Sequence, residues 1–180
     1  MSLRDRRTRR ANSEAAADCG SSATECACDE VSAVYAQAAD RAPQRSCESR
    51  TECCRFRLTG RTPYLTRGEA LVAARALRAT GRKSLPEPSA GDCPLLDVSG
   101  RCLIYEDRPF ACRSHFCSAA GGTYPRALVA DLVAALDAID ERLGGSGGVS
   151  LPSAVARALT EIDRERRENR SPGRRARGRR

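Results

Sequence analysis

Seven of the chain's ten cysteines lie between residues 47 and 117, and they form two groups. The first group is spaced C-x5-CC and the second C-x8-C-x9-C-x4-C; the members are Cys47, Cys53, Cys54, Cys93, Cys102, Cys112 and Cys117. Structural cysteines in an apolar core fit this pattern poorly, because most of the seven stand beside Arg, Pro or Gly. Thiolates are the usual ligands of zinc and of iron–sulfur clusters. The pattern therefore predicts that the two groups converge on a shared metal ion or cluster.

The rest of the sequence indicates where such thiols would act. No apolar run approaches the ~18 residues of a membrane span. The arginine-rich start is followed only by the apolar stretch 15–17, which is too short for a secretory signal. We therefore expect a cytoplasmic protein without a membrane segment. Persistent disulfides are uncommon in that compartment, which favours metal binding and leaves redox-active thiols as the alternative.

The spacing leaves both zinc and an iron–sulfur cluster open. Structural zinc modules usually offer close pairs such as C-x2-C, and the sequence has none; ferredoxin-type runs are absent from it as well. The adjacent pair formed by Cys53 and Cys54 is unusual. In an extended segment neighbouring side chains point to opposite faces. We therefore expect the two sulfurs to serve different centres, or one of them to be spare.

Arginines flank the cysteines and offer charge compensation for an anionic centre. A zinc ion with four thiolates is negatively charged, and nearby guanidinium groups offset that charge and lower thiol pKa values. We predict contacts to the bound group from Arg108 and Arg113, although arginine is abundant throughout the chain. His115 stands between Cys112 and Cys117. Imidazole binds zinc and iron, but a lone histidine is more often structural, so His115 stays outside the predicted ligand set.

Hydrophobic periodicity predicts helices separated by irregular segments. Apolar stripes indicate three helices, over 29–42, 124–143 and 152–168. Thr66 followed by Glu69 is a capping box, which predicts a further helix ending near Gly81. Residues 94–105 indicate a short hairpin. We therefore predict a mainly α fold with irregular cysteine-rich loops and one short β-hairpin, a small domain stapled by its metal.

Composition divides the chain and places its charge. The predicted parts are a disordered Arg/Ala/Ser-rich arm (1–28), a cysteine-cluster metal-binding domain (29–143), a flexible Gly/Ser linker (144–150), an accessory helix (151–169) and a disordered Arg-rich tail (170–180). The net charge of +8 at pH 7 comes from the ends, because residues 1–10 hold five arginines and residues 170–180 hold six. Such ends predict weak, nonspecific nucleic-acid binding, with simple solvation of the tails as the alternative.

One run of the sequence is specific enough to indicate a family. It reads C-L-I-Y-E-D-R-P-F-A-C-R from Cys102 to Arg113. Together with C-E-S-R-T-E-C-C from Cys47 and L-T-R-G-E from Leu65, it resembles the YkgJ-type cysteine-cluster family, a zinc- or iron-chelating domain with a CxxCxxCC motif. The resemblance covers about residues 45–120. It implies metal chelation, often proposed as an iron–sulfur cluster, and no agreed reaction.

The chain departs from this family at one position. The family's second cysteine falls at Arg50, so one ligand is missing or replaced. Cys26 or Cys28 is a candidate replacement from the N-terminal arm. A similar cluster occurs in flagellin lysine methylases, which suggests an ancillary role in protein modification. The sequence nevertheless has no Gly-rich loop after a strand that would bind a methyl donor.

Three functions follow from the sequence. The first is metal binding through the seven cysteines, in metal handling, electron transfer or an accessory module. The second is a thiol-redox or protein-modification enzyme, for which the sequence offers a single histidine and no Ser-His-Asp set. The third is nucleic-acid association through the tails. In the first case a metal-free chain is expected to be partly unfolded, because ordering the loops costs entropy that metal binding offsets.

Overall fold

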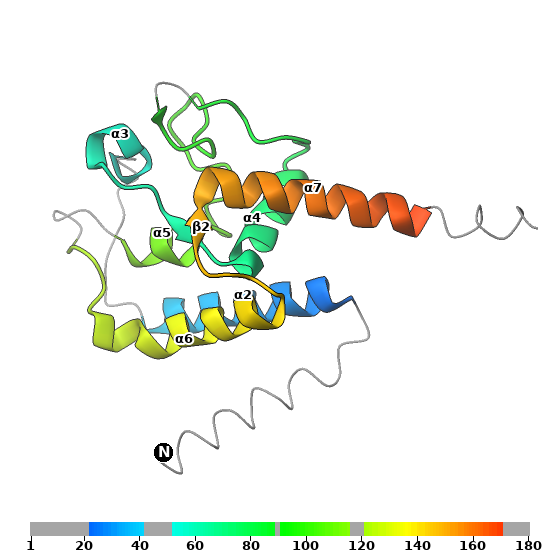
Figure 1. The fold of residues 1–180 in the computed structure, drawn as a ribbon. Helices are drawn as coiled ribbons and strands as arrows, with labels where there is room; N and C mark the ends of the chain where they lie inside the picture. The colour runs from blue at the N-terminus through cyan, green and yellow to red at the C-terminus, as the bar shows by residue number, and fades with distance from the viewer. Residues whose placement is uncertain (1–21, 42–51, 89–90, 116–120, 171–180) are drawn as a thin grey trace, which may run out of the picture.

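The structure is a computed structural model that describes residues 22–41, 52–88, 91–115 and 121–170 (Figure 1). The helices are α2 (Ala23–Asp40), α3 (Phe56–Thr59), α4 (Arg67–Ala79), α5 (Phe110–Ser114), α6 (Arg126–Arg142) and α7 (Leu151–Arg170). A 3-10 turn, η2, covers Glu52–Cys54, and two short strands, β1 (Tyr64–Leu65) and β2 (Val149–Ser150), pair antiparallel. The prediction of a mainly α fold with cysteine-rich loops is confirmed.

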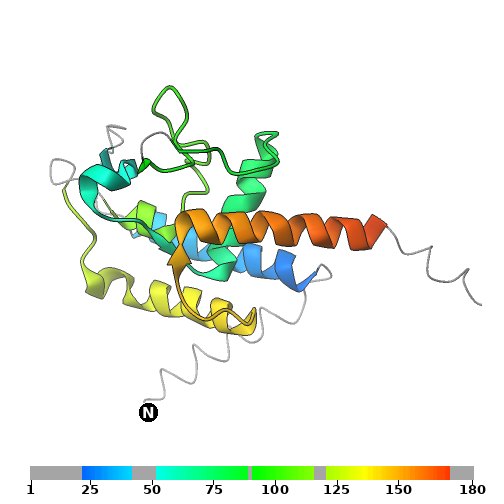
Figure 2. The same ribbon diagram turned by 45° about the horizontal axis from the view of Figure 1, so that its top comes forward.

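Helix α4 is the centre of the helical core. It contacts α2, α6 and α7. Helices α2 and α6 also lie against each other, as both ribbon views show (Figures 1 and 2). The predicted apolar stripes supply the contacts, with Val31, Leu71, Leu132 and Val155 at most 2% exposed. The cysteine-bearing segments lie together at one end of these helices, around α3 and α5 (Figure 1). The core thus provides a helical base for the site.

Helix α2 begins earlier than predicted. Its N-cap is Ser22. The Ser22 hydroxyl accepts a hydrogen bond from the Glu25 amide, and the Glu25 carboxylate accepts one from the Ser22 amide. This capping box starts the helix at Ala23 rather than Asp29, so part of the segment predicted as a disordered arm is helical. Cys28 is consequently buried in the helical core. The Ala/Ser-rich composition of this segment favoured a prediction of disorder over its capping box. The same kind of capping box, at Thr66 and Glu69, correctly predicted the start of α4.

The Gly-rich segment between α6 and α7 is held by one buried acid. The Asp140 carboxylate accepts from the Arg67 amide at 2.6 Å and from the Gly147 amide at 3.0 Å, and the Asp140 carbonyl accepts from Gly145. A Cβ at Gly145 would collide with that carboxylate. The segment predicted as a flexible linker therefore has a defined path, because glycine permits the close approach.

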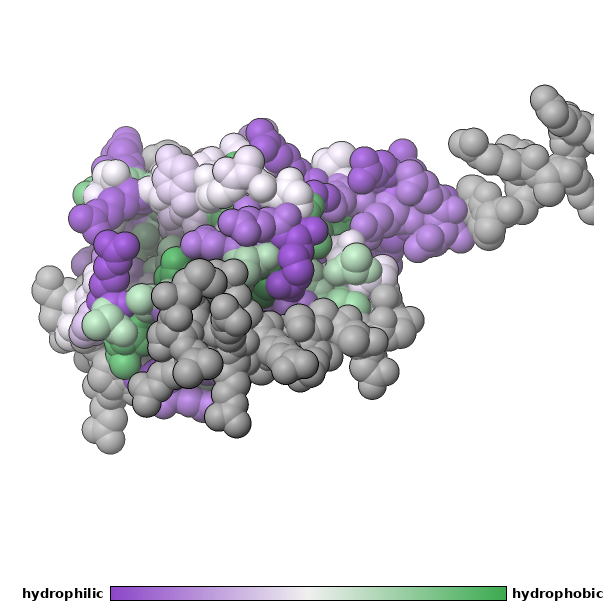
Figure 3. All heavy atoms as spheres, turned by 60° about the horizontal axis from the view of Figure 1, so that its bottom comes forward, coloured by the Kyte–Doolittle hydropathy of each residue, from purple (hydrophilic) through white to green (hydrophobic). Residues whose placement is uncertain are grey.

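This path brings α7 into the core. Strand β2 follows the glycines and pairs with β1, in the register Tyr64–Ser150 and Leu65–Val149. Leu151 and Val155 are then 1% and 0% exposed, and α7 packs along α4. The helix predicted as an accessory element beyond residue 143 is thus part of the main packing. Its C-terminal part extends past the other helices and has a hydrophilic surface (Figures 1 and 3).

The segment predicted as a hairpin is a compact turn. Its only bridge among the described residues joins Leu96 to Cys102. The Asp97 side chain accepts from the amides of Ser99 and Arg101, which closes the turn. The two-stranded sheet belongs to β1 and β2 instead. No helix in the described ranges combines the length and apolarity needed to cross a bilayer.

Gly68→Ala is expected to destabilise the fold, although alanine favours helices over glycine. A Cβ at Gly68 would lie 2.9 Å from Val31 Cγ2 on α2 and 3.1 Å from Ile139 Cγ2 on α6. Overpacking of this kind costs about 1–3 kcal/mol, whereas alanine gains at most ~1 kcal/mol in a helix interior. We expect a net loss of about 1–2 kcal/mol, measured by urea unfolding.

Val31→Ala supplies the matched test, because it removes the nearest methyl group. In that background the additional cost of Gly68→Ala should shrink or reverse. An unchanged cost in the double variant would contradict the close contact.

Candidate metal centre

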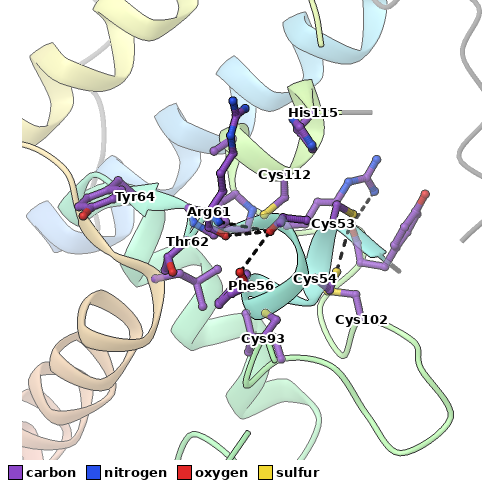
Figure 4. Close-up of a pocket in the computed structure, with 18 of the residues that line it drawn as sticks. Cys53, Cys54, Phe56, Arg61, Thr62, Tyr64, Cys93, Cys102, Cys112 and His115 are labelled. Carbon is purple, nitrogen blue, oxygen red and sulfur yellow. Dashed lines mark hydrogen bonds between the residues drawn. The ribbon is translucent and has the colours of Figure 1, made fainter. Parts of the chain in front are cut away.

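Five cysteines from both sequence groups line one cavity of about 670 Å³ (Figure 4). They are Cys53 and Cys54 on η2, Cys93 and Cys102 in the loops before α5, and Cys112 on α5. The predicted meeting of the two groups is therefore present for these five. Cys47 and Cys117, the other two predicted ligands, lie outside the described residues.

The adjacent cysteines point the same way, contrary to the expectation for an extended segment. Because Glu52–Cys54 forms a 3-10 turn, the Sγ atoms of Cys53 and Cys54 lie 4.0 Å apart. In a tetrahedral zinc site with bonds of about 2.3 Å, neighbouring sulfurs lie about 3.8 Å apart. The two sulfurs therefore lie close enough to serve the same centre, because the segment is a turn and not the extended strand that the prediction of separate centres or a spare thiol assumed; the centre that each thiol serves stays a prediction.

Backbone hydrogen bonds hold the two cysteine groups together. The Cys93 amide donates to the Cys54 carbonyl at 2.7 Å, which joins η2 directly to the second group. The Leu103 amide donates to the Leu95 carbonyl at 2.8 Å and keeps Cys102 beside Cys93. These bonds bring the thiols close without any contribution from the sulfur atoms.

Glu69 fixes the third segment, α5. Its buried carboxylate accepts from the Phe110 amide at 2.8 Å and from the Tyr35 hydroxyl at 3.3 Å. The other oxygen accepts from the amide and the hydroxyl of Thr66, both at 3.0 Å. Burial raises the pKa of Glu69, and these hydrogen bonds oppose that shift. Sequence reasoning found Glu69 only as a helix cap; its link to α5, and so to Cys112, has no local signal.

The thiols differ in their electrostatics. Burial raises the pKa of Cys93 to about 12, and it also raises the pKa values of Cys102 and Cys112. The hydrogen bond within the adjacent pair lowers the pKa of Cys53 to about 6, helped by Arg108, and raises the pKa of Cys54. Most of these thiols are therefore protonated without a metal, and thiolate ligation releases those protons.

The two predicted arginines have different positions. Arg108 lines the cavity, where its guanidinium lies 4.0 Å from the centre of the Tyr105 ring. Arg113 is absent from the described lining. Its guanidinium lies 4.3 Å from the centre of the Tyr35 ring and donates to the carbonyls of Arg108 and Glu106. Arg113 therefore holds the loop before α5, while Arg108 is the one that faces the thiols.

Two further candidates are also placed. His115 lines the cavity, and its Nδ1 lies 3.4 Å from the Thr123 hydroxyl. Cys28 is buried among the core residues of α2, where burial raises its pKa, and it is not part of the described lining. The structure therefore places Cys28 in the helical core and not among the cysteines that line the cavity.

The donor set fits a borderline or soft metal. Five thiols face one cavity, and thiolates bind zinc and iron–sulfur clusters. Within the described part of the chain, however, no three Cys, His, Asp or Glu side chains are grouped closely enough to hold one metal ion. For these five thiols alone, binding of a single ion would require side-chain rotation, whereas a larger group could reach the separate sulfurs.

Residues 45–128 match the family model CxxCxxCC, described as "Putative zinc- or iron-chelating domain". The matched segment spans both cysteine groups and confirms the family resemblance predicted from the sequence. No curated protein and no solved structure matches the chain.

Proposed function

We propose, with the zinc- or iron-chelating segment 45–128 as the premise, that this chain holds a thiolate metal centre in its cysteine-lined cavity. The ligands are drawn from the five lining cysteines together with Cys47 and Cys117. The observation that supports this most strongly is that thiols from two segments separated by α4 line the same cavity. When bound, the group supplies either electron transfer, if it is an iron–sulfur cluster, or structural cross-linking, if it is zinc.

Between the two, we favour the cluster. A preformed zinc site groups four ligands around one point, with sulfurs about 3.8 Å apart. Among the described residues no such group of three ligands exists, although the adjacent pair is close. A cluster reaches more widely placed thiolates, because several metal and sulfide atoms lie between them. The protein's own part is to present the sulfurs and to place Arg108 beside their negative charge.

Elemental analysis of protein purified without oxygen tests this proposal. The cluster version predicts a coloured protein with iron and acid-labile sulfide in similar amounts. A colourless protein with about one zinc per chain would remove the cluster and keep the thiolate centre. Protein that binds neither metal after reconstitution would overturn the proposal.

Serine substitutions separate ligands from other buried thiols. Cys93→Ser and Cys112→Ser are each expected to weaken metal binding by about 100-fold or more. Substitution of residues that only support metal ligands already costs about 10–100-fold in affinity, and these two cysteines are proposed ligands themselves. Cys28→Ser is the matched control, since Cys28 is also a buried free thiol but lies in the helical core. The metal content of each folded variant is measured against the unmodified chain. Equal loss in Cys28→Ser would show that the effect comes from folding instead.

A further inference from the structure

The charges of helix α7 are divided between its inner and outer sides. Three of its four acids are only partly exposed and contact other helices; the pairs are Glu161 with Arg67, Asp163 with Arg78, and Glu165 with Thr24. The first two are ion pairs with α4, and the third is a hydrogen bond of 3.0 Å from a hydroxyl on α2. The fold therefore uses most of the negative charge of α7 on its inner side.

These contacts withdraw the acids from the arginines of the same helix. Side chains three or four positions apart on a helix are neighbours and can form ion pairs. That spacing would pair Glu161 with Arg164 and Asp163 with Arg167, so the sequence of this segment indicates mixed, balanced charge. In the fold both acids contact α4 instead. Five arginines of α7 are exposed against one exposed acid, Glu168; the arginines are Arg157, Arg164, Arg166, Arg167 and Arg170.

Four of the five arginines form a row on the outer face of the helix. Arg157, Arg164, Arg167 and Arg170 follow at intervals of seven, three and three residues, which places them along one side of a helix with 3.6 residues per turn. The row is about 20 Å long, because each residue adds about 1.5 Å. The part of α7 that carries most of it extends past the other helices and has a hydrophilic surface (Figures 1 and 3). The row is therefore open to a large partner.

The chemistry of the row favours a nucleic acid as that partner. Guanidinium groups bind phosphate oxygens, and a nucleic acid presents a continuous line of phosphates. A lipid surface fits less well, because membrane-bound helices insert an apolar face. The apolar face of α7 packs on α4, and the helix has no apolar residue after Ile162. Residues 171–180 add five more arginines to the sequence directly after the row.

We propose that the outer face of α7 binds the phosphate backbone of a nucleic acid, without reading its base sequence. The arginine row, named by Arg157, Arg164, Arg167 and Arg170, follows the backbone, and the inner acids hold α7 in place on α4 and α2. This interface is separate from the cysteine-lined cavity, to whose described lining α7 contributes only Leu151. Binding here therefore does not depend on the proposed metal centre.

The salt dependence of binding tests this proposal on the full chain. Fluorescence anisotropy measures the affinity for a short DNA duplex and a short RNA single strand at several salt concentrations. Each phosphate contact contributes about −0.9 (duplex) or −0.7 (single strand) to the slope of log K against log salt. The double variant Arg164→Gln and Arg167→Gln should therefore make that slope less steep by about 1.5–2. Two DNA duplexes of unrelated sequence should bind equally.

The matched control removes the same charge elsewhere. Arg57→Gln together with Arg126→Gln changes exposed positions on α3 and α6 and should leave the slope unchanged. Circular dichroism checks that both double variants are folded, which we expect because glutamine and arginine have similar helix propensities.

The other outcomes would overturn the proposal. An unchanged slope in the Arg164→Gln and Arg167→Gln variant would place the contacts elsewhere on the chain, and equal changes in both variants would reduce the effect to net charge. Binding to phosphatidylserine vesicles but to neither nucleic acid would assign the row to a lipid surface, and binding to none of the probes would remove the interface. The metal content of each sample decides the proposed function separately.

Discussion

Glu69→Ala is expected to lower the free energy of unfolding by about 3–5 kcal/mol, because several buried donors lose their acceptor at about 1–3 kcal/mol each. Glu69 is 4% exposed. Its carboxylate accepts hydrogen bonds from the Tyr35 hydroxyl, the Phe110 amide, and the amide and hydroxyl of Thr66. Alanine would leave these donors buried without an acceptor. Urea unfolding of the variant, compared with the unmodified chain, measures the loss.

The same variant should also lose metal affinity. Glu69 accepts from the amide of Phe110, the first residue of α5, and Cys112 lies two residues further along that helix. Glu69→Gln keeps an acceptor oxygen and should fall between alanine and the unmodified chain in both measurements. Glu141→Ala on the exposed face of α6 is the control, with an expected change within about 0.5 kcal/mol. A Glu69→Ala variant as stable as Glu141→Ala would show that the carboxylate does not tie α5 to the core.

Removal of the metal is expected to release the cysteine-bearing segments while the helical core persists. Metal binding at a tetrathiolate site contributes on the order of 10 kcal/mol near neutral pH. The segments over 52–65 and 91–115 contain only short elements, and a few side chains such as Leu65, Leu95 and Ile104 anchor them in the core. Helices α2, α4, α6 and α7, in contrast, supply most of the buried residues of the apolar core and pack against one another.

Limited proteolysis with and without a chelator checks this expectation. New cleavage sites should appear within 52–65 and 91–115, and the helical circular dichroism signal should fall by a minor fraction. Restoring zinc or iron should restore protection, whereas magnesium, which prefers oxygen ligands, should not. A metal-free chain that resists the protease as well as the loaded one does would contradict a stabilising centre.

Local signals in the sequence were enough for most of the helical core. The capping box at Thr66 and Glu69 starts α4 as predicted, and Leu132, Leu136 and Ile139 form the buried face of α6. Such features depend on residues three or four positions apart, and a periodic pattern contains them. The start of α2 had the same kind of signal at Ser22, but a composition typical of disorder outweighed it.

Features that depend on distant partners were not predictable in this way. The glycines before α7 are ordered by Asp140 and by pairing with β1, so their composition alone indicated a flexible linker. The turn that aligns the sulfurs of Cys53 and Cys54 is likewise not encoded by their adjacency. At the candidate site, the convergence of the two cysteine groups was expected from ligand chemistry. The link through Glu69 was missed because nothing nearby in the sequence indicates Phe110 as its partner.

The hydrogen bond between the Cys93 amide and the Cys54 carbonyl has a consequence for how a metal is captured and released. Once sulfurs of one segment hold the metal and the segments fold, this hydrogen bond keeps the sulfurs of the other segment nearby, so the next capture is intramolecular and has a high effective concentration. Partly loaded chains should then be scarce during titration. The metal dissociates only if several metal–sulfur bonds break before any of them re-forms. We therefore expect slow exchange of the metal with competing chelators.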